Sequence, residues 1–74
     1  MTVDLNEHYG VTISEAGRTR AGYAAVGELF NRRTMNNIGI SVRGEGRTWV
    51  SASDRALREA RAQCPSRAPT DDDE

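Results

Sequence analysis

The sequence, 74 residues long, is poor in the residues that build metal sites, disulfides and large cores. It has one histidine and one cysteine, His8 and Cys64. A single cysteine excludes a disulfide scaffold, and the pair is too small a set for a metal site made of soft ligands. Aromatic residues make up 5% of the chain and hydrophobic residues 36%, which limits the core to that of one small domain. No stretch approaches the roughly 20 apolar residues of a membrane helix, and the acidic N-terminus does not resemble a signal peptide. We therefore expect a cytoplasmic domain without metal or cofactor.

Lysine is absent, and all ten basic residues are arginine. The first 64 residues hold nine arginines and seven acids, a net charge of +2, whereas residues 65–74 hold one arginine and four acids. This asymmetry predicts a single domain over residues 1–64 and a disordered acidic tail over 65–74. The tail either keeps the protein in solution or competes for the basic face. The exclusive use of arginine reflects either codon bias or selection for guanidinium forks.

The first half of the chain gives one clear pattern and one ambiguous one. Residues 9–14 alternate apolar and polar side chains, which predicts a strand, and residues 15–18 have turn character. The helical spacing of Tyr23, Val26 and Leu29 favours a helix over residues 21–33. The alternative is a strand that pairs back on the first one.

The second half predicts a β-hairpin followed by a helix. Residues 38–43 alternate, Gly44-Glu45-Gly46 resembles a hairpin loop, and residues 47–51 are rich in β-formers. Ser51 or Ser53 then caps a helix with Asp54 in its first turn, and Pro65 ends that helix.

Together these elements predict an α+β fold: a small antiparallel sheet with a central hairpin and one or two helices on one face. Such a core is thin, so we expect a monomer or a weak homodimer. The expected core residues are Val11, Ile13, Leu29, Phe30, Ile38, Ile40, Val42, Trp49, Val50 and Leu57.

We predict no catalytic residues, and so no enzyme. His8 and Cys64 have no third group to orient them, and Glu7 and Glu15 lack the spacing of an acid–base pair. The Gly44–Gly46 loop lacks the lysine and hydroxyl residue of a phosphate-binding loop.

One binding hypothesis concerns nucleic acid. Arg43 and Arg47 flank the expected hairpin loop, and the following helix carries a basic stripe of Arg55, Arg58 and Arg61. The hairpin-then-helix order of residues 38–61 resembles the arm-binding domains of phage integrases and plant-type AP2 domains. That resemblance implies a small DNA-binding module.

The favoured hypothesis is a protein partner, bound by Arg43 and Arg47 and then by Arg32 and Arg33. The chain resembles the short phage-encoded inhibitors of bacterial RNA polymerase, of the kind carried by a Xanthomonas phage. This resemblance rests on size, the arginine-only composition, the opening Thr2-Val3-Asp4-Leu5-Asn6, and a basic body with an acidic tail. It implies a non-enzymatic regulator that binds a polymerase subunit, blocks promoter recognition and alters termination.

Overall fold

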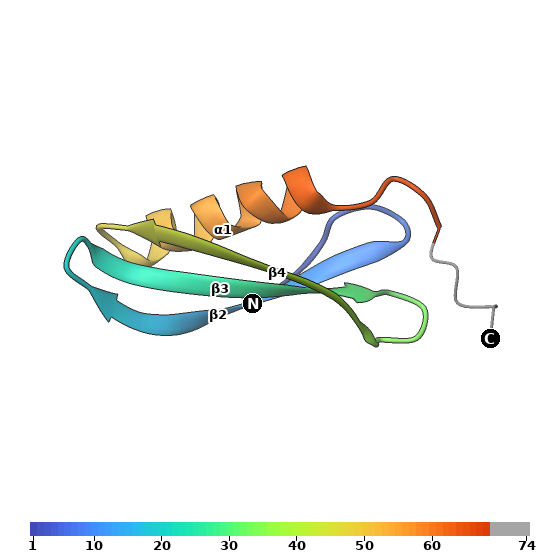
Figure 1. The fold of residues 1–74 in the computed structure, drawn as a ribbon, viewed down its shortest axis with the longest axis horizontal. Helices are drawn as coiled ribbons and strands as arrows, with labels where there is room; N and C mark the ends of the chain where they lie inside the picture. Colours follow the sequence, from blue (N-terminus) through green and yellow to red (C-terminus); the bar gives the residue numbers. More distant parts are fainter. Residues whose placement is uncertain (69–74) are drawn as a thin grey trace.

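The computed structural model describes residues 1–68, which form one antiparallel sheet and one helix (Figure 1). The strands are β1 (Thr2–Asp4), β2 (Tyr9–Thr19), β3 (Gly22–Asn31) and β4 (Asn37–Gly46), and the helix is α1 (Trp49–Gln63). The strands lie side by side in chain order, β1-β2-β3-β4, and α1 packs on one face of the sheet. The predicted α+β class is confirmed, with a single helix over the described residues.

β2 begins as predicted and continues further. Val11 and Ile13 are fully buried, whereas the intervening Thr12 is exposed. The turn predicted at residues 15–18 is wrong, because β2 runs on to Thr19 through a β-bulge. Glu15 pairs with Ala25 and Gly17 with Ala24, so Ala16 is the extra residue, and Gly17 adopts a φ of 132°.

The helix predicted over residues 21–33 is wrong, and the alternative strand is correct. This segment forms β3, the strand between β2 and β4, and its register pairs Tyr23 with Arg18 and Leu29 with Val11. Leu29 packs beneath α1, while the neighbouring Phe30 is buried against Gly10 on the strand beside it. Because adjacent residues of β3 are buried on both faces, the alternation that marks a half-exposed strand is missing.

The hairpin predicted over residues 38–51 is also wrong. β4 pairs with β3 and extends through Gly46, and α1 begins at Trp49, so no strand follows the glycines. A Cβ atom on Gly44 would overlap the backbone nitrogen of Ala56 and lie 2.5 Å from the carbonyl oxygen of Ala52. The glycine therefore makes room for the helix instead of forming a mobile loop.

α1 begins earlier than the sequence suggests. Thr48 is the N-cap: its side chain accepts a hydrogen bond from the Ser51 amide at 3.1 Å, and the Ser51 hydroxyl accepts one from the Thr48 amide at 3.3 Å. This capping box replaces the predicted caps at Ser51 and Ser53, and the first turn contains no acidic residue. The end of the helix is confirmed, because α1 ends at Gln63, two residues before Pro65.

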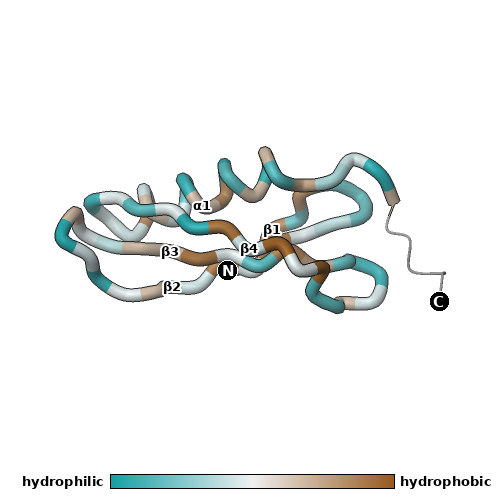
Figure 2. The backbone as a smooth tube through the Cα atoms, in the orientation of Figure 1, coloured by the Kyte–Doolittle hydropathy of each residue, from teal (hydrophilic) through white to brown (hydrophobic). Residues whose placement is uncertain are grey.

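The core is smaller and richer in alanine than predicted. Among the expected members, Val50 is 67% exposed, and Ile38, Ile40, Trp49 and Leu57 are only partly buried. The hydropathy colouring places the hydrophobic segments mainly in the middle of the molecule (Figure 2). The buried cluster under α1 consists of Val11, Ile13, Ala25, Leu29, Val42, Ala52, Ala56 and Ala60.

The start of the predicted tail contacts the domain. The side-chain amide of Asn6 donates a hydrogen bond to the carbonyl oxygen of Pro65 at 3.2 Å, and Pro65 is partly buried. The acidic residues 71–74, on which the tail prediction depends, lie outside the described residues.

Candidate functional site

The four arginines predicted to bind a partner do not form one patch. Arg43 lies on β4, Arg47 lies in the connection between β4 and α1, and Arg32 and Arg33 lie in the turn between β3 and β4. That turn and that connection are at opposite ends of β4, about 30 Å apart for a ten-residue strand. The predicted hairpin tip, with an arginine on each side, does not exist.

The predicted nucleic-acid site is divided in the same way. All three arginines of the stripe, Arg55, Arg58 and Arg61, are exposed on α1. Arg43 lies on the other side of the sheet, because its neighbours Val42 and Gly44 face the helix. The stripe and Arg43 therefore lie on opposite sides of the sheet, and the predicted hairpin loop that would bring Arg43 and Arg47 together does not form in residues 38–51.

Two of the predicted arginines already have partners within the chain. Arg32 forms an ion pair with Asp4 at 3.3 Å and donates a hydrogen bond to the carbonyl oxygen of Asn6 at 2.9 Å. Arg43 donates two hydrogen bonds to one oxygen of Glu45, from Nε at 3.2 Å and from Nη2 at 3.1 Å. These side chains are substantially exposed, so each ion pair contributes about 1 kcal/mol or less to stability.

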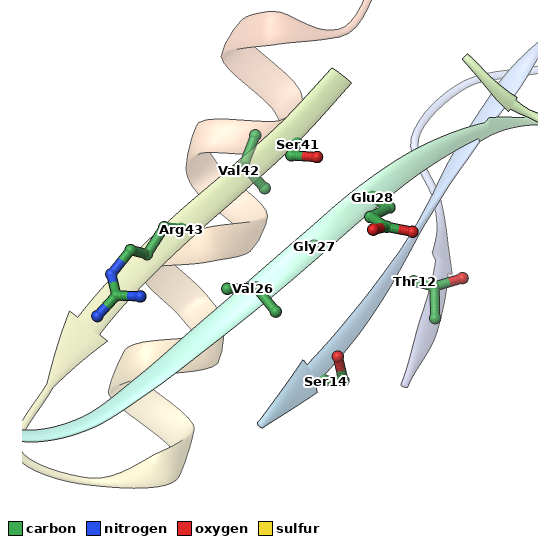
Figure 3. A pocket seen from close by; sticks show the side chains of 8 residues that line it. All are labelled: Thr12, Ser14, Val26, Gly27, Glu28, Ser41, Val42 and Arg43. Atoms are coloured by element: carbon green, nitrogen blue, oxygen red, sulfur yellow. The ribbon is translucent and has the colours of Figure 1, made fainter. Parts of the chain in front are cut away.

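The face of the sheet opposite α1 is uncovered and contains a shallow hollow of about 540 Å³ (Figure 3). The strand register produces two rows across it, Thr12–Glu28–Ser41 and Ser14–Val26–Arg43. Val26 is the only apolar side chain of these rows and is half-buried. Around it lie three hydroxyl groups, a guanidinium and the Glu28 carboxylate, which accepts a hydrogen bond from the side-chain amide of Asn37 at 3.0 Å.

A second candidate surface lies at the end of the sheet where β2 turns into β3. Arg18, Arg20 and Arg47 line a depression of about 510 Å³ there. Sequence reasoning missed Arg18 and Arg20, because it ended the strand before them and predicted a helix after them. The signal that could have found them is the Arg-Thr-Arg-Ala-Gly segment, with two arginines directly before a glycine turn.

Tyr23 orients Arg18 in this second surface. The guanidinium carbon of Arg18 lies 5.3 Å from the centre of the Tyr23 ring, and Nη2 donates a hydrogen bond to the phenolic oxygen at 3.2 Å. The hydrogen bond to Tyr23 raises the pKa of Arg18 above its usual value.

Asn6 lies between the only histidine and the only cysteine. Its carboxamide oxygen accepts from the backbone nitrogen of His8 at 2.8 Å, and its nitrogen lies 3.4 Å from the sulfur of Cys64. Burial raises the pKa of the Cys64 thiol, which disfavours the nucleophilic thiolate. The Nε2 atom of His8 lies 3.5 Å from a carboxylate oxygen of Glu7. The contacts of Asn6 with Cys64 and Pro65 attach the C-terminal end of the helix to the start of the chain.

Within residues 1–68, no group of three or more histidine, cysteine or acidic side chains is arranged to hold a metal ion. The one helix of this part of the chain is too short and too polar to cross a membrane. Comparison with protein-family models, curated proteins and solved structures finds no match to this chain.

Proposed function

We propose that this protein is a small non-enzymatic regulator that acts by binding a protein partner through the uncovered face of its sheet. The observation that carries the proposal is the hollow opposite α1, where Val26 lies among polar side chains of three strands. The proposed target is a bacterial RNA polymerase subunit in the cytoplasm of a host cell, as the resemblance to phage inhibitors implies.

The chemistry of the face favours a protein over a polyanion. Its central side chain is apolar, and the surrounding Thr12, Ser14 and Ser41 hydroxyls both donate and accept hydrogen bonds. Charges of both signs are present, since Glu28 and Glu45 accompany Arg43. Two carboxylates beside one guanidinium repel a phosphate backbone, whereas a mixed charge pattern complements an ordinary protein surface.

Val26 supplies the apolar centre that a stable interface needs. A partner side chain that covers it removes apolar area from water, while the hydroxyls around it keep the partner's polar groups hydrogen-bonded. Arg43 contributes to binding at the rim of the interface, where a carboxylate of the partner replaces Glu45 or shares the guanidinium with it. In this arrangement Arg32 supports the fold through Asp4, and its effect on binding is indirect.

The test is the affinity for purified bacterial RNA polymerase, measured by calorimetry, together with promoter-dependent transcription. Val26→Glu places an unpaired charge at the centre of the interface and should weaken binding at least tenfold. Ala62→Glu introduces the same group on the exposed side of α1 and serves as the matched control. Ser41→Arg, at an exposed position of the same face, provides a second variant if Val26→Glu alters the fold.

Thermal unfolding of each variant separates loss of binding from loss of structure. Equal affinity of the wild type and both sheet variants would remove the uncovered face from the proposal. Absence of binding to the polymerase and its subunits would remove the proposed target.

A further inference from the structure

The end of the molecule formed by the β2–β3 turn and the β4–α1 connection is a second surface, separate from the hollow opposite α1. We propose that this end binds the phosphates of duplex nucleic acid through Arg18, Arg20 and Arg47. The inference goes beyond the proposed protein partner and does not depend on it, because the two surfaces share no lining residue.

Direct backbone contact brings the three arginines together from distant parts of the sequence. Gly22 ends the β2–β3 turn with a φ of 136°, and a Cβ atom at this position would lie 2.5 Å from the Gly46 oxygen and 2.7 Å from the Arg47 Cα. The turn therefore rests against the start of the connection, which places Arg20 and Arg47 at the same depression although 27 positions separate them.

None of the three cations is neutralised by an ion pair within residues 1–68. No acidic residue lines the depression, and the first turn of α1 has none. Within residues 1–68, Arg20 and Arg47 make no ion pair, and the nearby Glu45 is held by Arg43. Glu15 is the one acid whose charge acts on Arg18. The opposite end of the sheet differs, because Asp4 neutralises Arg32 there.

Arginine is suited to phosphate because its planar fork donates two parallel hydrogen bonds. The hydrogen bond to Tyr23 fixes one Nη atom of Arg18 and leaves its other N–H groups available. The Thr19 hydroxyl in the same depression accepts from the Ala21 amide at 3.2 Å and retains its proton for an additional oxygen. The site thus presents several donors and no competing carboxylate.

The shape of this end favours a duplex over a small anion. β4 accompanies β3 as far as Tyr23, and the hydrophilic β2–β3 turn lies beside the β4–α1 connection at this narrow end of the molecule (Figures 1 and 2). Three arginines around a depression of about 510 Å³ can contact several phosphates at once, as the backbone of a duplex presents them.

The experiment measures binding to a fluorescently labelled 20-base-pair DNA duplex of arbitrary sequence by anisotropy, as a function of salt. For three phosphate contacts, the logarithm of the affinity should fall with the logarithm of salt concentration with a slope of about −2.7. The double variant Arg20→Ser/Arg47→Ser should reduce the slope to about −0.9 and weaken binding about tenfold or more at low salt. Arg18→Lys keeps the charge and tests the role of the fork.

The matched control is Arg58→Ser/Arg61→Ser, which removes the same charge from the exposed side of α1. The inference requires that this control change the affinity less than about twofold while thermal unfolding of both double variants stays close to the wild type. Equal loss in the two double variants would show non-specific charge attraction and overturn it. Displacement of the duplex by poly-glutamate at equal charge concentration would identify a carboxylate-binding surface and overturn it as well. Retained polymerase binding by Arg20→Ser/Arg47→Ser would keep the two proposals distinct.

Discussion

The two faces of the sheet use the same three long strands and are built on opposite principles. Under α1 the sheet buries apolar side chains, and its closest approach to the helix is made by small residues, Gly44 and Gly46 on β4 against Ala52 and Ala56. On the other face polar side chains surround Val26, and the sheet is uncovered. Arg43 and Gly44 are neighbours in the chain, yet one belongs to a surface open to a partner and the other to a contact that excludes any side chain. The role of a β4 residue thus depends on its face.

The strongest test of this contrast is Gly44→Ala. The added methyl group overlaps backbone atoms of α1, which cannot move aside as a flexible side chain does, so we expect a loss of about 3 kcal/mol or more in the free energy of unfolding. Gly39→Ala is the control on the same strand: its φ is 85°, but no atom lies within 4 Å of the added Cβ. Urea denaturation should rank Gly44→Ala as clearly more destabilising, and equal losses would contradict the close helix–sheet contact.

A second test concerns two serines of α1 that lie two positions apart. The Ser53 hydroxyl is buried and has no hydrogen-bond partner within the described part of the chain. Ser53→Ala should therefore raise stability by about 1 kcal/mol, which corresponds to a rise of about 4–8 °C in melting temperature. Ser51→Ala removes half of the capping box and should lower stability by about as much. Calorimetry that gave both changes the same sign would contradict this assignment.

The smallest expected effect on stability is that of Arg43→Ala on the uncovered face. Its ion pair with Glu45 is solvent-exposed, so we expect a change within about 0.5 kcal/mol, although the residue lies beside Gly44. Polymerase binding should weaken in the same variant, because the guanidinium lies at the rim of the hollow. A large loss of stability would mean that Arg43 supports the fold instead of serving the surface.

The fold class, the strand at residues 9–14 and the C-terminal end of α1 could be predicted from the sequence, because each depends on a local pattern. The sequence was insufficient for β3, where the neighbours Leu29 and Phe30 are buried on opposite sides of the strand and imitate helical spacing. The glycines of β4 indicated a loop, because only the tertiary contact with α1 explains them. The surface formed by Arg18, Arg20 and Arg47 depends on both elements and could not be predicted without them.

The bulge at Ala16 changes which residues of β2 face the helix. Before the bulge the odd-numbered residues Val11 and Ile13 face the helix, and after it the even-numbered Arg18 shares the side of Tyr23. Because of the one additional residue, the side chains of β2 after Ala16 point to the opposite faces from those that simple alternation would give. The part of β2 before Ala16 keeps its regular register. The inner part of β2 therefore supplies buried side chains to the core, while the outer part turns a charged residue, Arg18, toward the side that Val11 and Ile13 occupy earlier in the strand.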